Sequence, residues 1–149
     1  MKNNNKGFTL IELLATLTIL GIMMVIAIPN VQKFIDRSKE DNLDANTKML
    51  YMAAKSYYQT NPQELPKQNG ASYIITSGEL KYKNFLKDYL KNGNKQTCTY
   101  FKYDSENRPV FDSTKDSHVI VKKEDKNKYS YTVKIICNAD GKILKEVTY

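Results

Sequence analysis

This sequence has little of the chemistry from which enzyme sites are built. Its 149 residues include one histidine, two cysteines and no tryptophan. The lone histidine, His118, is expected to be a surface or capping residue rather than a catalyst or a metal ligand. There is also no HExxH motif, no glycine-rich phosphate loop, and no serine or cysteine nucleophile with an identifiable base. We therefore predict no enzymatic activity, no metal site and no cofactor.

Arginine is scarce as well, since Arg37 and Arg108 are the only two, yet the chain carries a net charge of +7. The charge comes from scattered lysines, which indicate a solvated basic surface. Attraction to an anionic partner such as DNA or teichoic acid stays open. No nucleic-acid-binding motif supports nucleic acid as that partner.

Acidic residues gather in one short part of the sequence, between two expected strands: Asp104, Glu106, Asp112 and Asp116. Carboxylates are calcium ligands, but this spacing does not match that of an EF-hand loop. We therefore expect solvated loop residues rather than a calcium site.

What the sequence does have is a long apolar run near its beginning. A polar leader, residues 1–7, carries Lys2 and Lys6 and precedes the apolar run 8–28, which is long enough to span a bilayer. One charge, Glu12, interrupts this run. A carboxylate costs about 2.5–3.5 kcal/mol at the centre of a membrane and less near its surface. We therefore expect Glu12 to have a partner.

The motif Lys6-Gly7-Phe8-Thr9-Leu10-Ile11-Glu12, followed by apolar residues as far as Pro29, resembles the type IV prepilin signal of type IV pilins and pseudopilins. The resemblance implies that a membrane peptidase cleaves after Gly7 and that Phe8 becomes an N-methylated terminus. It also implies that Glu12 pairs with an N-terminal amine during subunit assembly. Beyond Pro29 only the general layout can be compared.

Two other interpretations of residues 8–28 are less complete. A secretory signal peptide carries a small-residue cleavage site after its apolar core, and none follows Ile28. A plain membrane anchor fits the length of the run but leaves Glu12 unexplained.

The apolar run continues into an amphipathic pattern, residues 29–60. Apolar and small residues recur there at spacings of three, four and seven: Phe34, Ile35, Ser38, Leu43, Asn46, Leu50, Ala53, Ala54 and Tyr57. We predict one long helix from Phe8 to about Thr60, whose second half packs on a globular head. Pro29 removes one helical hydrogen bond, and the resemblance implies that the segment from Gly21 to Pro29 unwinds in an assembled filament.

The head is predicted to comprise residues 61–149, with a loop and a short helix over 61–96. A capping box at Thr76-Ser77-Gly78-Glu79 predicts that this helix occupies about 77–91. Residues 97–149 are expected to form an antiparallel sheet, with strands at 97–103, 118–122, 129–137 and 142–148. The predicted fold class is α+β, a long N-terminal helix packed against a small sheet.

Cys98 and Cys137 lie in the part that we place outside the membrane. A pair of cysteines outside the cytosol indicates a disulfide, and Cys137 falls on the alternating apolar face of its strand. Two buried free thiols remain the alternative.

The resemblance implies a structural subunit of a type IV pilus that supports adhesion, motility or a related surface function. Its expected partners are other pilin subunits, a prepilin peptidase, and an assembly ATPase with its membrane platform. The chain is expected to cross the bacterial cell membrane once before it joins an extracellular filament. Two alternatives stay open: a pseudopilin of a type II-like secretion or DNA-uptake machine, and a binding domain with a simple membrane anchor.

Overall fold

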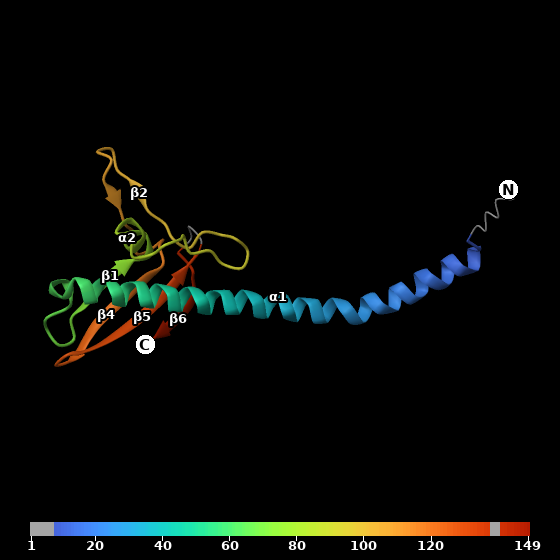
Figure 1. Cartoon of the computed structure of the whole chain (residues 1–149), viewed down its shortest axis with the longest axis horizontal. Coiled ribbons are helices and arrows are strands. Elements are labelled where there is room, and N and C mark those ends of the chain that lie inside the picture. The colour runs from blue at the N-terminus through green and yellow to red at the C-terminus, as the bar shows by residue number, and fades with distance from the viewer. Residues whose placement is uncertain (1–7, 138–140) are drawn as a thin grey trace, which may run out of the picture. The chain divides into compact units, whose positions relative to one another are not determined.

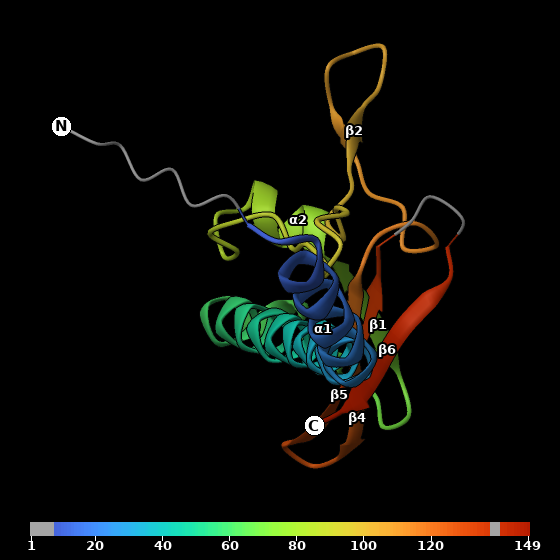
Figure 2. The same ribbon diagram turned by 90° about the vertical axis from the view of Figure 1, so that its right-hand side faces the viewer.

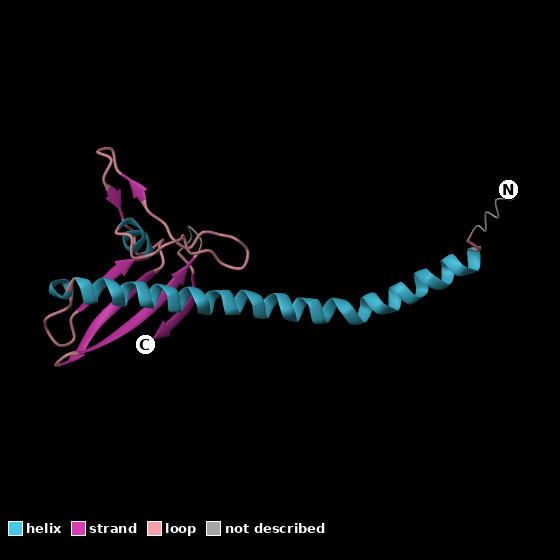
Figure 3. Cartoon of the chain, in the orientation of Figure 1, coloured by secondary structure: helices cyan, strands magenta, loops and turns pink. Residues whose placement is uncertain are grey.

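The computed structural model describes residues 8–137 and 141–149. A long N-terminal helix, α1 (Leu10–Thr60), is followed by a small antiparallel sheet (Figure 3). The predicted α+β fold class is therefore confirmed. The chain divides into two compact units, Met1–Arg37 and Ser38–Tyr149, and each is described by itself.

In the second unit, α1 buries one face and exposes the other. Leu50, Ala54 and Tyr57, which share one helix face, are at most 2% exposed. The predicted amphipathic pattern was wrong for Phe34 and Ile35, which lie in the first unit and are 74% and 45% exposed.

The sheet against which this face packs has four antiparallel strands in the order β1 (Ser72–Thr76), β4 (His118–Asp125), β5 (Lys128–Ile136) and β6 (Ile143–Thr148). The second half of α1 lies along one side of this sheet (Figures 1 and 2). Alternate residues of a strand point to one face, and the inward residues of the central strands are fully buried: Val119, Val121, Val133 and Ile135. They form one core with the buried face of α1.

The region between α1 and β4 differs from the prediction in several elements. It contains a strand, β1, where only loop and helix were expected, and a short 3₁₀ helix, η1 (Pro62–Glu64). The α-helix α2 (Ser77–Tyr82) begins as predicted, because the Thr76 hydroxyl accepts a hydrogen bond from the Glu79 N–H at 3.1 Å. It ends well before residue 91, and the chain turns at Asn84 with a φ of 64°. The predicted helix was therefore too long.

The predicted strand at 97–103 was also largely wrong. Only β2 (Lys102–Tyr103) forms, and it pairs with β3 (Pro109–Val110) in a separate hairpin that extends away from the main sheet (Figures 1 and 2). The preceding residues bond elsewhere, because the Cys98 N–H donates to the Leu90 carbonyl at 2.7 Å.

Candidate functional site: the N-terminal helix and the disulfide-linked loop

The helix α1 begins with a capping box. The Thr9 N–H and hydroxyl donate to the Glu12 carboxylate at 2.8 and 2.9 Å, and the Glu12 N–H approaches the Thr9 hydroxyl at 3.4 Å. Thr9 directly precedes the first helical residue, which is the Thr-x-x-Glu arrangement of a capping box. Sequence reasoning missed this role, although the spacing was the signal for it. Glu12 thus has a partner within its own chain.

The capping box uses only part of the hydrogen-bonding capacity of the Glu12 carboxylate. An ionised carboxylate accepts about four hydrogen bonds, and Thr9 supplies two of them. The Glu12 side chain is exposed in the single chain. It is therefore able to cap α1 and to accept hydrogen bonds from a second chain at the same time.

The apolar side chains are exposed from Phe8, just before α1, to Ile28 within it, the former by 85% and the latter by 54%. The Thr16 and Thr18 hydroxyls donate to carbonyls of their own helix at 2.8 Å, so neither hydroxyl is an unpaired donor. By length and composition, α1 contains a segment able to cross a membrane. So large an apolar surface indicates contact with lipid or with other protein chains.

The other residues of the N-terminal segment that were predicted to have a role are Gly7, Gly21 and Pro29. Gly7, the predicted cleavage position, lies outside the described residues. Gly21 and Pro29 both lie inside α1, which is continuous through them. Next to Pro29, the Asn30 side-chain amide donates to the Ile26 carbonyl at 3.2 Å. Unwinding between Gly21 and Pro29 stays a prediction.

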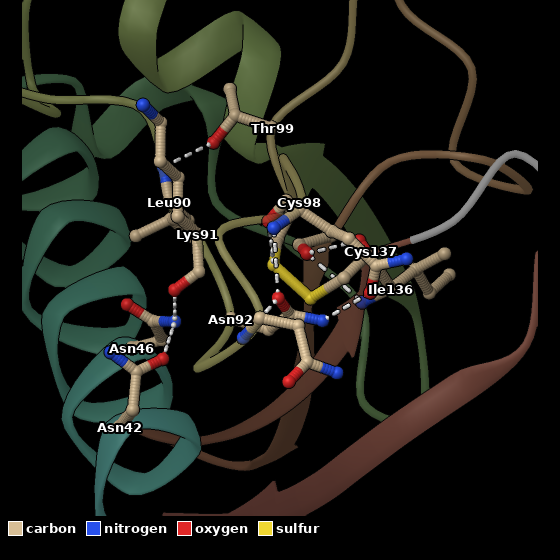
Figure 4. The surroundings of a disulfide bond; sticks show 12 residues. Asn42, Asn46, Leu90, Lys91, Asn92, Cys98, Thr99, Ile136 and Cys137 are labelled. Atoms are coloured by element: carbon tan, nitrogen blue, oxygen red, sulfur yellow. Dashed lines mark hydrogen bonds between the residues drawn. A yellow bond between two sulfur atoms is a disulfide. The ribbon is translucent and has the colours of Figure 1, made fainter. Parts of the chain in front are cut away.

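Cys98 and Cys137 form a disulfide, which confirms the predicted bond and excludes the two free thiols. Cys98 lies in the loop between α2 and β2, and Cys137 directly follows β5 (Figure 4). The two residues are 1% and 4% exposed and belong to the core. The bond therefore fastens the loop to one of the central strands of the sheet.

Hydrogen bonds also hold the same loop. The Leu90 N–H donates to the Thr99 hydroxyl at 2.9 Å within the loop, and the Asn46 side-chain amide, from outside the loop, donates to the Lys91 carbonyl at 2.9 Å (Figure 4). Because Asn46 belongs to α1, the loop bridges the helix and the sheet. A segment with almost no regular secondary structure is thus fixed at both sides.

Asp116 is not the solvated loop acid that was expected, because it is fully buried. Its carboxylate accepts hydrogen bonds from the Ser77 hydroxyl and the Gly78 N–H, both at 2.6 Å, and from the Tyr100 N–H at 2.8 Å. Burial raises the pKa of Asp116 to about 6, and these hydrogen bonds offset that effect only in part. Asp116 therefore joins the start of α2 to the chain just before β2.

In the described part of the chain, no group of three acidic, histidine or cysteine residues is placed to hold a metal ion. A further expectation for this region concerns His118. His118 is only 7% exposed and its Nδ1 lies 3.0 Å from the Asp116 carbonyl oxygen. Of the two expected roles, a surface or a capping residue, the surface role was therefore wrong.

The buried Asp116 predicts an unusual dependence of stability on pH. Its pKa is higher in the folded chain than in the unfolded one, so the folded state binds the extra proton between about pH 4 and pH 6. The contribution of Asp116 to stability is therefore greatest below pH 4 and is lost as the pH rises through 6, by up to about 3 kcal/mol. Urea unfolding of the protein in detergent at pH 4.5 and 7 measures this difference. The Asp116→Asn variant should show no such difference in stability between the two pH values. A variant whose stability depends on pH as that of the wild type does would contradict the assignment of this effect to Asp116.

Comparisons with known proteins agree with the interpretation of the N-terminal segment. Residues 2–28 match a family model described as the prokaryotic N-terminal methylation motif. The chain is 52% identical to the type IV major pilin protein PilA of Myxococcus xanthus over 54 residues, which cover 36% of this chain and 24% of PilA. It is 33% identical to a fimbrial protein of Neisseria meningitidis serogroup B over 93 residues, which cover 62% and 54% of the two chains.

A third relative is the type IV major fimbrial protein FimA of Dichelobacter nodosus, with 41% identity over 56 residues, or 38% of this chain and 36% of FimA. The matches thus span between about a quarter and about half of the length of these curated relatives. No solved structure matches this chain. Type IV pilins are structural subunits, so the relatives agree with the prediction that the chain is not an enzyme. The chain thus carries an N-terminal methylation motif and is similar, over part of its length, to type IV pilins.

Proposed function

We propose that this chain is a structural subunit of a type IV pilus, which polymerises through its N-terminal helix. The observation that carries the proposal is the exposed apolar segment, residues 8–28, which lies within the match to the methylation motif and has one carboxylate, Glu12, near its start. In this proposal residues 1–7 are a leader, residues 8–28 cross the membrane before assembly, residues 29–60 support the head, and residues 61–149 are the head. A prepilin peptidase cleaves after Gly7, and Phe8 is then N-methylated.

Assembly exchanges lipid for protein around the apolar segment. Apolar side chains gain no hydrophobic free energy on leaving lipid, so packing and polar pairing between helices drive the association. An assembly ATPase and its membrane platform supply the work of extraction. The heads then coat the outside of a helical bundle and carry its adhesion or motility functions.

Glu12 sets the register of that bundle in this proposal. Cleavage leaves a new amine on Phe8, next to Thr9, and a neighbouring copy presents the same amine. The Glu12 carboxylate is able to accept it while retaining its two hydrogen bonds from Thr9. An ion pair of this kind is much stronger in an apolar bundle than in water, and any other register leaves the carboxylate unpaired.

A deletion strain complemented with the chain tests the proposal. Electron microscopy of sheared surface material should show filaments that contain this protein, and the uncomplemented strain should lack them. Loss of protein secretion or of transformation, with no surface filament in either strain, would instead favour a pseudopilin. A full-length chain that stays in the membrane without either phenotype would favour a simple anchored domain.

A further inference from the structure

The end of α1 borders a pocket in the head. The pocket has a volume of about 440 Å³ and lies where α1 and η1 meet β1 and α2. Tyr57 and Tyr58 line it from α1, and Tyr73 with its two following isoleucines lines it from β1. Its charged lining residues are both acidic, Glu64 from η1 and Glu79 from α2. Mainly apolar and aromatic walls with a few polar groups are typical of a site for a small ligand.

The Tyr58 hydroxyl is one of these polar groups, and it has no partner. The side chain is only 4% exposed. In the described part of the chain, every fully buried side-chain oxygen has a hydrogen-bond partner, whereas the Tyr58 hydroxyl has none. This hydroxyl must therefore reach the surface, which it does at the pocket that Tyr58 lines. Burial raises the pKa of Tyr58, and the negative charges of Glu79 and Glu64 raise it further.

Glu64 brings a carboxylate without a counter-ion to the same pocket. Its Oε2 accepts a hydrogen bond from the Tyr57 hydroxyl. Among the described residues, Glu64 forms no ion pair and its Oε1 accepts no hydrogen bond. Glu79, by contrast, pairs with Lys83 at 2.9 Å. The two carboxylates and this one ammonium group leave one negative charge beside the pocket.

Lys83 shows which kind of ion this corner of the head holds. Its Nζ lies 4.5 Å from the centroid of the Tyr57 ring and donates to the Tyr57 hydroxyl at 2.5 Å. The face of an aromatic ring attracts a cation, so ring, hydroxyl and the Glu79 carboxylate together hold an ammonium group. Lys83 itself does not line the pocket, and none of the described residues that do is cationic. The pocket therefore offers the same three kinds of group to a second cation.

From the carboxylate without a counter-ion, the unpaired hydroxyl and the aromatic wall, we infer that this pocket binds a primary alkylammonium group. The ammonium group donates hydrogen bonds to the Glu64 carboxylate and to the Tyr58 hydroxyl, and the first of these is strengthened by charge. The alkyl chain lies against the wall that Tyr73 provides. Free diamines and exposed lysine side chains both carry this group. The inference goes beyond the proposed function, because binding needs the folded head and not a filament.

Isothermal titration calorimetry tests the inference with the full chain in a nonionic detergent. The chain is titrated with cadaverine, a free diamine, with acetyl-lysine methylamide, which presents a lysine side chain, and with pentanol, which has no charge. Both amines should bind, and pentanol should bind at least about tenfold more weakly, because a hydrogen bond to a charged group is lost. The amine that binds more tightly identifies the source of the ligand. Binding of neither amine, or equal binding of pentanol, would overturn the inference.

Three variants locate the binding in the pocket. Glu64→Gln keeps the shape of the side chain but removes its charge, and should weaken amine binding at least about tenfold. Tyr58→Phe removes a neutral partner and should weaken it about threefold. Glu106→Gln makes the same change of charge at an exposed acid that does not line the pocket, and should leave the affinity unchanged.

The outcome for Glu64→Gln decides whether the site is correctly placed. Its melting temperature is measured alongside, so that a folded variant with wild-type affinity would overturn the inference. An equal loss of affinity in Glu106→Gln would show that binding follows net charge, which would overturn it as well. Filament formation by the unchanged chain is measured separately. Amine binding by a chain that forms no filament would contradict the proposed function alone.

Discussion

Replacing Glu12 by glutamine is expected to abolish filaments while leaving the chain cleaved and membrane-embedded. Glutamine keeps the side-chain oxygen that a capping box needs, so the start of α1 should survive. What disappears is the negative charge that pairs with the terminal amine of a neighbour. Removing one partner of a buried, hydrogen-bonded ion pair costs about 2–5 kcal/mol, so filament yield should fall more than about tenfold. Surface filaments and membrane-fraction protein are measured in the same strain.

Two matched variants separate assembly from capping. Thr9→Ala removes the Thr9 hydroxyl from the capping box but keeps the Glu12 carboxylate, so filaments should persist. Glu12→Val removes both the capping oxygen and the negative charge, and it should behave like Glu12→Gln in assembly. Each variant must be the only copy expressed, because wild-type subunits would carry defective ones into a filament. Normal filament yield from Glu12→Gln, with a loss in Thr9→Ala, would show that capping is the role that matters.

Reduction of the disulfide is expected to cause the largest loss of stability in the head. The bond joins residues separated by 39 positions, and in the chain-entropy model a loop of that size contributes about 3–4 kcal/mol. The melting temperature should fall on the order of 10–15 °C. Thermal unfolding of the full chain in detergent, with and without reductant, measures the change.

The double variant Cys98→Ala and Cys137→Ala is the control for that measurement. It should melt near the temperature of the reduced wild-type chain and should not respond to reductant. The hydrogen bonds from Asn46 to Lys91 and from Leu90 to Thr99 remain in it, so the loop should loosen without unfolding the sheet. A wild-type chain that melts at the same temperature in both conditions would contradict a stabilising disulfide.

Features set by local pattern were predicted well from this sequence. The apolar run and the three- and four-residue spacing sufficed for α1, a run of β-branched residues sufficed for β4, and alternation sufficed for β5. Thr76 was recognised as a helix cap because the signal lies within four residues. The same type of signal at Thr9 and Glu12 was overlooked, since the resemblance to prepilins had already supplied a role for Glu12.

Features set by contacts distant in the sequence were not predictable. The backbone of Cys98 bonds to Leu90 and Ser117 rather than to a neighbouring strand, and no local pattern indicates that choice. Asp116 resembles any other loop acid until the fold brings Ser77 and Tyr100 to it.

The most direct test of assembly through a processed N-terminal helix is the intact mass and N-terminal sequence of the protein in sheared surface filaments. The chain should begin at Phe8 and carry the mass of one added methyl group. An intact Met1 would show that the chain is not cleaved, and a mature terminus beyond Pro29 would show that the apolar segment is lost. Either result would contradict assembly as a type IV pilin.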